Sequence, residues 1–135
     1  MKSVLVTGGS GYIGTHTIYC LLDRGFKVYT IDSHINSSKL SLKDVVKALS
    51  IKHKNIGAKL REFSGDIRNK GLLKQIFISS LEEATPIIGV IHLAGLKSVS
   101  ESVRIPQEYW ENNVYGTMSL LKIMQEFECN TIVFS

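Results

Sequence analysis

A cluster of glycines near the amino terminus, in the stretch VLVTGGSGYIGTH, has the spacing of a phosphate-binding turn. The spacing fits G-x-G-x-x-G when read from Gly9 and G-x-x-G-x-x-G when read from Gly8. In both arrangements Gly8 can adopt the positive φ of a tight turn, Gly11 lets a pyrophosphate approach the backbone, and Gly14 lets a helix pack closely. The free N–H groups at the start of that helix would then bind the phosphates.

A carboxylate at the end of the next predicted strand favours a dinucleotide as the ligand. Asp32 directly follows the β-branched and aromatic run 27–31. At that position a carboxylate accepts hydrogen bonds from both hydroxyls of an adenosine ribose and repels a 2′-phosphate, which favours NAD over NADP. The alternative is a solvated turn aspartate that binds no ligand.

Strand and helix signals alternate along the chain and predict the elements that position these residues. The predicted strands are 4–7, 27–31, 59–63, 87–93 and 131–135, and the predicted helices are 11–24, 42–51, 69–79 and a long one from about Pro106 to Met124. Connections of this length join parallel strands, so we expect an α/β fold with a doubly wound parallel (Rossmann) sheet of strand order 3-2-1-4-5. Four residues of the long helix are expected in its core-facing stripe: Trp110, Val114, Leu120 and Leu121.

The fifth predicted strand is apolar and would form an open edge of the sheet. We therefore expect one NAD-binding Rossmann domain over residues 1–135 that is truncated after strand five. On this interpretation the chain is the N-terminal part of a longer enzyme, and the C-terminal substrate domain is absent.

Composition argues against several other classes of protein. The net charge of +4 comes from dispersed lysine and arginine, without the charge blocks typical of nucleic-acid binding. No apolar run approaches the ~20 residues that span a bilayer, and no signal peptide is recognised, so neither a membrane nor nucleic acid is an expected partner. Cys20 and Cys129 form no C-x-x-C pair, which favours a reducing, cytoplasmic location. No metal site is expected, because the four histidines share no metal-binding spacing: His16, His34, His53 and His92.

Over its whole length the sequence resembles the extended short-chain dehydrogenase/reductase family and, within it, the UDP-glucose 4-epimerases. The resemblance runs through VLVTGGSGYIGTH, GDIRN, IHLAGLKSVSESV and PQEYWENNVYGT. The third segment is the most specific, since sugar-nucleotide dehydratases of this fold carry an AAESHVD-type segment there. The resemblance implies an isomerase of galactose metabolism that interconverts UDP-glucose and UDP-galactose through a 4-keto sugar, with transient hydride transfer to tightly bound NAD. It also implies a UDP-sugar substrate for the full-length protein and a homodimer formed partly by the long helix.

The same resemblance implies a set of cofactor-binding residues. They are Gly8, Gly11, Tyr12, Ile13, Gly14, Asp32, Ser33, Asn36, Ser37, Asp66, Ile67, Leu93, Ala94, Gly95, Lys97, Asn112 and Ser135. Positions 12–13 would contact the pyrophosphate and Asp32 the ribose. Ser33, Asn36 and Ser37 would contact the adenosine end, and positions 66–67 the adenine. Positions 93–95 would pass beneath the middle of the cofactor, and Lys97 would approach its phosphates and ribose. Asn112 and Ser135 would lie on the nicotinamide side, although Lys97 could instead be a solvated loop residue and Asn112 could simply cap or pack.

The catalytic pair of the family, Tyr-x-x-x-Lys, is not present in the chain. The residues four positions after Tyr12, Tyr19, Tyr29, Tyr109 and Tyr115 are His16, Asp23, Ser33, Asn113 and Ser119. The family's catalytic serine is likewise expected beyond Ser135, so the 135 residues alone are expected to be inactive. Two other interpretations stay open: a different NAD-dependent nucleotide-sugar enzyme, such as a 4,6-dehydratase or a UDP-glucuronate epimerase, and a non-catalytic NAD-binding module.

Overall fold

The computed structural model describes residues 1–34, 41–96 and 99–135. Its elements in chain order are β1 (Ser3–Thr7), α1 (Tyr12–Asp23), β2 (Lys27–Asp32), α2 (Ser41–Leu49), the 3-10 turn η1 (Ile56–Lys59), β3 (Leu60–Ser64), α3 (Lys70–Glu82), β4 (Ile87–His92), α4 (Val99–Arg104), α5 (Pro106–Trp110), the π-helical turn η2 (Glu111–Tyr115), α6 (Gly116–Glu126) and β5 (Ile132–Phe134).

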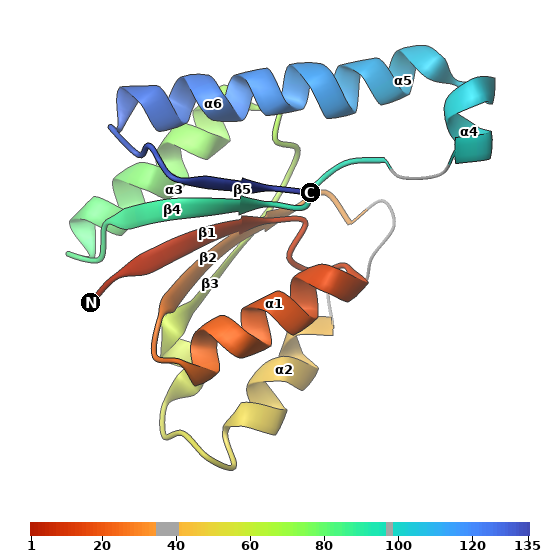
Figure 1. Cartoon of the computed structure of the whole chain (residues 1–135). Helices are drawn as coiled ribbons and strands as arrows, with labels where there is room; N and C mark the ends of the chain where they lie inside the picture. Colours follow the sequence, from red (N-terminus) through yellow and green to blue (C-terminus); the bar gives the residue numbers. More distant parts are fainter. Residues whose placement is uncertain (35–40, 97–98) are drawn as a thin grey trace.

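The five strands form one parallel sheet in the order β3-β2-β1-β4-β5, which confirms the predicted topology. Figure 1 shows α1 and α2 on one face of the sheet and α3 with the α5–α6 run on the other. The carboxyl ends of all strands therefore meet at one edge, where the chain passes repeatedly from strand to helix. In folds of this kind that edge carries the ligand crevice.

Both faces of the central strands are buried, which explains their near-continuous apolar sequences. Alternate side chains of a strand point to opposite faces. Leu5 and Tyr29 accordingly belong to the core beneath α3 and α6, whereas Val4 and Val6 belong to the core beneath α1 and α2. The sheet is thus held rigidly from both sides behind the edge that carries the candidate site.

The C-terminal helical region differs from the prediction in three ways. The short helix α4 was not predicted, and the long helix contains the π-helical turn η2 between α5 and α6. Leu120 is fully buried as expected, but the core assignments of Trp110 and Leu121 are wrong, since 57% and 45% of their surfaces are exposed. The sheet covers only one side of this helix, and the apolar stripe of the helix is wider than that side. Trp110 and Leu121 therefore remain exposed.

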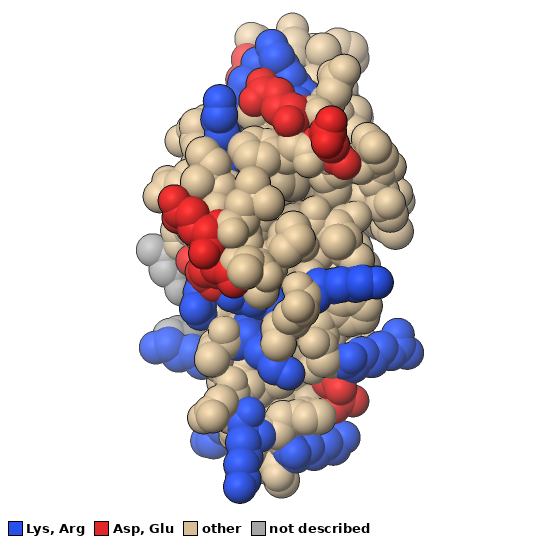
Figure 2. Space-filling view, turned by 90° about the vertical axis from the view of Figure 1, so that its left-hand side faces the viewer, with Lys and Arg blue, Asp and Glu red and all other residues tan. Residues whose placement is uncertain are grey.

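The outer surfaces reflect the position of each element. Val133 and Phe134 of the edge strand β5 are exposed, in keeping with the apolar open edge that the sequence indicates. Figure 2 looks at the side where the strands begin, and lysine and arginine side chains dominate the lower half of this view. Among the described residues, none of the helices has both the length and the apolar character needed to cross a bilayer.

Candidate cofactor-binding cleft

An open cavity of about 300 Å³ lies at the carboxyl edge of the sheet. It is lined by Gly8, Gly11, Tyr12, Ile13, Gly14, Ile31, Asp32, Ser33, Gly65, Asp66, Ile67, Leu93, Ala94, Gly95, Leu96, Asn112 and Ser135. Fourteen of the predicted cofactor-binding residues are in this lining, while Asn36, Ser37 and Lys97 lie outside the described residues. Segments that are far apart in the sequence therefore converge on one concave surface.

Two glycines of the first turn are required by the geometry of the turn itself. Gly8 has φ +72, and a Cβ there would lie 2.9 Å from the backbone nitrogen of Ala94. At Gly14 a Cβ would collide with the carbonyl oxygen of Gly8 and lie 2.7 Å from the Cα of Gly9. The turn and the first turn of α1 thus approach each other more closely than any other residue type permits.

Gly9 and Gly11 have contrasting surroundings. A Cβ at Gly9 would collide with Thr30 Oγ1 and lie 2.7 Å from Ile18 Cδ1, so this glycine is needed for packing behind the turn. A Cβ at Gly11 would meet only Gly8 O, at 3.5 Å, because this residue faces the cavity and not the protein. The open approach to Gly11 fits the role predicted for it, which is to admit a ligand to the backbone.

The start of α1 presents backbone donors to the same space. The first intrahelical bond runs from Thr15 N to Gly11 O at 2.9 Å, and no side chain caps the helix at Gly11. The earlier N–H groups of a helix have no acceptor within it, and the helix dipole adds a partial positive charge there. An anionic group in the cavity at this position would be stabilised by both effects.

Asp32 is oriented by two backbone amides. Its Oδ2 accepts from Ser10 N at 3.0 Å, and its Oδ1 accepts from His34 N at 2.7 Å. The first bond joins the end of β2 to the glycine turn, so the carboxylate is fixed beside the start of α1. Asp32 also lines the cavity, as the prediction of a ribose ligand requires.

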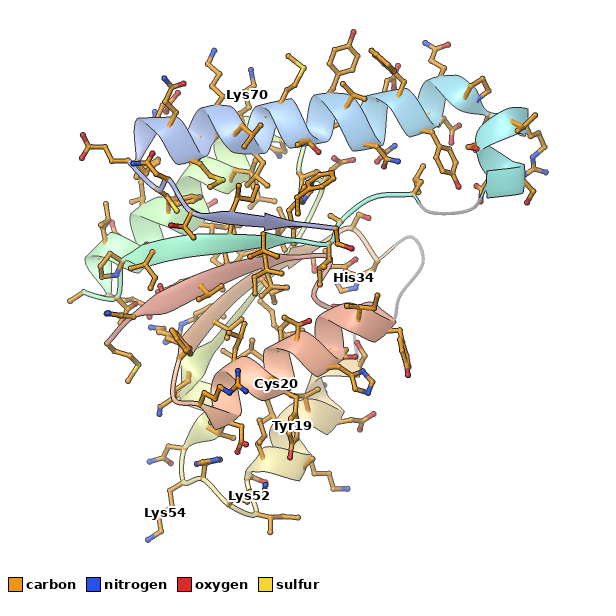
Figure 3. The ribbon with its side chains drawn as sticks, viewed as in Figure 1. Tyr19, Cys20, His34, Lys52, Lys54 and Lys70 are labelled. Carbon is orange, nitrogen blue, oxygen red and sulfur yellow. The ribbon has the colours of Figure 1, made fainter. Side chains whose placement is uncertain are left out.

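His34 follows Asp32 at the same edge of the sheet (Figure 3). It has a left-handed backbone conformation with φ 61, and its Nε2 lies 3.3 Å from Ser64 Oγ at the end of β3. Its Nδ1 is buried and has no hydrogen-bond partner among the described residues. No binding role was predicted for this histidine.

Where Asp66 lines the cleft, Arg68 holds its side chain. The backbone N–H of Arg68 donates to Asp66 Oδ1 at 2.8 Å, and its Nη2 donates to Oδ2 at 2.6 Å. These hydrogen bonds lower the pKa of the Asp66 carboxyl below its ordinary value of 3.8. Arg68 Nη1 also lies 3.4 Å from Glu111 Oε2, which connects this loop to η2.

This ion pair predicts a pH-dependent contribution to stability. Because the pKa of Asp66 is lower in the folded protein, its contribution is present above the ordinary pKa and is lost as the pH falls through the folded pKa. We expect Arg68→Gln to lower the free energy of unfolding by up to about 1 kcal/mol at pH 7, since the pair is partly exposed. The difference from the wild type should shrink as the pH falls below about 4.

Urea unfolding at a series of pH values measures this difference. Lys70→Gln, which removes an exposed cation at the start of α3, serves as the matched control. An Arg68→Gln effect that is constant from pH 7 to pH 3 would rule out the carboxylate as its origin.

The floor of the cavity is the segment 93–95, and its backbone is fastened to β1. Thr7 Oγ1 accepts from Leu93 N and from Ala94 N, both at 3.1 Å. Asn112 also lines the cavity, but its Nδ2 donates to Glu108 O at 2.9 Å, so half of its amide is used within its own helix. This bond fits the packing alternative for Asn112, although the residue remains part of the wall.

Three lining residues were not predicted: Ile31, Gly65 and Leu96. Each adjoins a predicted residue in the chain, and each lies at or just beyond the end of a strand. The signal in the sequence that could have identified them is their position near the end of a predicted strand, because parallel strands bring such residues to the same edge of the sheet.

The fold and the cleft define a doubly wound α/β protein whose ligand crevice lies at the carboxyl ends of the parallel strands. A family model described as GDP-mannose 4,6 dehydratase matches residues 5–135, and the chain belongs to this family.

Comparison with individual proteins identifies closely similar relatives. The UDP-glucose 4-epimerase 3 of Oryza sativa subsp. japonica is 45% identical over 133 residues, covering 98% of this chain and 34% of that protein. The UDP-glucose 4-epimerase of Yersinia pestis is 43% identical over 132 residues, covering 98% and 36%. The resemblance to UDP-glucose 4-epimerases is thereby confirmed. The chain spans about a third of the length of these relatives.

Solved structures give the same result. A UDP-glucose 4-epimerase from Bifidobacterium longum in complex with NAD+ and UDP has a TM-score of 0.84 and 39% identity, covering 99% of this chain and 36% of that one. A UDP-glucose-4-epimerase from Stenotrophomonas maltophila with bound NAD and formylated UDP-arabinopyranose has a TM-score of 0.84 and 34% identity, with the same coverage.

Proposed function

We propose that this chain is the NAD-binding part of a UDP-glucose 4-epimerase, which interconverts UDP-glucose and UDP-galactose through a 4-keto intermediate. The observation that carries the proposal is the convergence of a glycine turn, a helix start and the Asp32 carboxylate on one cleft. Relatives that match 98% or more of the chain are named as epimerases, and a similar structure contains NAD and UDP. Residues 1–135 would form one NAD-binding domain of a longer enzyme, since the chain spans only about a third of those relatives.

The described residues suit NAD along the length of the cleft. The turn around Gly11 would bind the pyrophosphate, Asp32 would accept from the adenosine ribose, and Asp66 with Ile67 would hold the adenine. The segment 93–95 would support the middle of the cofactor, and Ser135 would lie beside the nicotinamide ribose. Bound NAD would supply a reversible hydride acceptor, while these residues bind and orient it. Asn36, Ser37 and Lys97 keep their predicted roles at the adenosine end and the phosphates.

Activity should require residues that this chain does not contain. We expect the 135 residues to show no conversion of UDP-galactose to UDP-glucose, because no tyrosine is followed four residues later by lysine. General acid–base catalysis contributes roughly 10²–10⁴ in rate, and substrate positioning contributes more. A coupled assay on this chain and on the full product of its gene, each with added NAD, provides the comparison. Turnover by the short chain, or none by the full product, would contradict the proposal.

A homodimer is the proposed assembly. Four apolar side chains are exposed along the α5–η2–α6 run: Trp110, Tyr115, Met118 and Leu121. An exposed apolar face of this kind is typical of an interface. The family resemblance also implies that this helix contributes to a subunit interface. We expect Met118→Lys to shift the full gene product from dimer to monomer in analytical ultracentrifugation, whereas Lys122→Met should not. A dimer that survives Met118→Lys would move the interface elsewhere.

We propose a cytoplasmic location, because the two cysteines of the chain form no C-x-x-C pair. Cys20 and Cys129 are both free, as expected of thiols in a reducing compartment.

The 4,6-dehydratase alternative retains one specific argument, which is the description of the matching family model. Assaying the full gene product for loss of water from a nucleotide sugar would separate the two reactions.

A further inference from the structure

A buried histidine connects the floor of the cleft, segment 93–95, to the helical region that contains the turn η2. His92 is the last residue of β4 and is 1% exposed. Its Nδ1 lies 2.6 Å from Thr7 Oγ1 on β1, and its Nε2 lies 2.9 Å from Thr117 Oγ1 on α6. The ring thus joins the centre of the sheet to the helix that crosses above it (Figure 1). We call this arrangement the Thr7–His92–Thr117 bridge.

The neighbouring hydrogen bonds determine which ring nitrogen carries the proton. The Thr117 hydroxyl donates its proton to Asn113 O at 2.6 Å, so its oxygen accepts from the ring, and the proton of the neutral His92 ring is on Nε2. Nδ1 then accepts the hydroxyl proton of Thr7. The Thr7 hydroxyl oxygen also accepts the backbone N–H of Ala94 and shares that of Leu93 with the Thr7 carbonyl. The hydrogen bonds of the bridge therefore all run in one direction, from Thr7 through His92 and Thr117 to Asn113.

Both ends of the bridge terminate on the cleft. At one end, Thr7 holds the amides of Leu93 and Ala94, which form the floor. At the other end, Asn113 bonds back to Leu96: its Oδ1 accepts from Leu96 N at 2.8 Å, and its Nδ2 donates to Leu96 O at 2.9 Å. The hydrogen bonds therefore connect the two ends of segment 93–96 to η2.

The helical partner of the bridge is irregular at this position. Asn113 belongs to the π-helical turn η2, which also carries Asn112 into the wall of the cleft. π-helical turns are rare in proteins, and those that occur are often located at functional sites. It shifts the backbone out of regular α-helical register, and the bridge supplies hydrogen bonds that hold it in that position.

We propose that His92 is a positioning residue that sets the distance between the floor of the cleft and the turn carrying Asn112, and so preorganises the cleft for the middle of a dinucleotide. This inference rests on the proposed function, because it concerns the same cleft. His92 contacts the ligand only through the segments that it holds. Loss of either arm of the bridge would leave a floor that must be ordered during binding, which weakens affinity.

Variants of the two arms test this role through NAD binding measured by calorimetry, independently of any turnover. Thr117→Val removes the Nε2 arm. His92→Asn keeps an acceptor for the Thr7 hydroxyl and loses the same arm. We expect each to raise the Kd for NAD roughly three- to tenfold, the usual effect of one hydrogen bond. The double variant should bind no more weakly than either single variant, because all three lack the same arm.

Tyr29→Phe is the matched control, because it removes a buried hydrogen bond, Tyr29 OH to Thr85 Oγ1 at 2.9 Å, that belongs to no wall of the cleft. It should lower thermal stability by a similar amount and leave the Kd for NAD within about twofold. Nitrogen-15 shifts of the His92 ring should report a protonated Nε2 and an unprotonated Nδ1. A protonated Nδ1, or Thr117→Val with the affinity of Tyr29→Phe, would overturn the inference. A wild-type protein that binds no NAD would instead overturn the proposed function.

Discussion

Replacement of Gly14 by alanine is expected to destabilise the protein by about 3 kcal/mol or more, which is among the larger effects of a single methyl group. The added Cβ would collide with Gly8 O and lie 2.7 Å from Gly9 Cα. Both obstacles are backbone atoms of a turn that is already fixed by the positive φ of Gly8. The only relief is to move α1 away from the turn, which would also separate the helix start from the cleft. Urea unfolding followed by circular dichroism measures the loss.

Two other glycine substitutions make this prediction specific. Gly71→Ala in α3 introduces the same methyl group where it meets only Asn69 Oδ1, at 3.4 Å, so helix propensity should stabilise the protein by up to about 1 kcal/mol. Gly11→Ala should change stability little, since its Cβ has ordinary contacts, but should weaken NAD binding because it occupies the open side of the turn. Wild-type stability in Gly14→Ala would mean that the turn is looser than described.

Loss of the charge at Asp32 is expected to have the largest effect on cofactor binding. Asp32→Asn removes a charged acceptor and sets an NH₂ group against one of the two amides that orient it, Ser10 N or His34 N. Hydrogen bonds to charged groups contribute about 1.5–3 kcal/mol, so the Kd for NAD should rise roughly 10- to 100-fold. The Kd for NADP should change less, because removal of the carboxylate also removes the repulsion of a 2′-phosphate.

Asp44→Asn is the control for this experiment, since it makes the same substitution at an exposed position of α2 that does not line the cleft. Its affinity for both cofactors should match that of the wild type. Equal losses of NAD and NADP binding in Asp32→Asn would indicate a general disturbance of the cleft. In that case the carboxylate would not be the discriminating group.

The parallel topology and most of the cleft could be predicted from the sequence, because both follow from local patterns. The glycine spacing at 8–14 and the carboxylate after the second strand can be recognised in the sequence without knowledge of contacts between distant residues. Strand order follows from the alternation of elements and the handedness of crossovers. Residues such as Asp66 and Ile67 were assigned through the family resemblance, and the structure brings them to the same cavity.

The remaining features depend on contacts between residues far apart in the chain. The need for glycine at position 9 comes from Thr30, and the fastening of the floor comes from Thr7, more than eighty residues before Ala94. Helical periodicity indicated an apolar stripe but could not show how much of it the sheet covers, which is why Trp110 was assigned to the core. The π turn at 111–115 carries no local sequence signal of its own.

The most direct test of the central claim is a calorimetric titration of the wild-type protein with NAD and with NADP. A dinucleotide seated on the start of α1, with Asp32 at its ribose, predicts saturable binding of one NAD per chain. It also predicts that NADP binds at least about tenfold more weakly, a difference of about 1.4 kcal/mol. Equal affinity for the two cofactors, or binding of neither, would contradict the account.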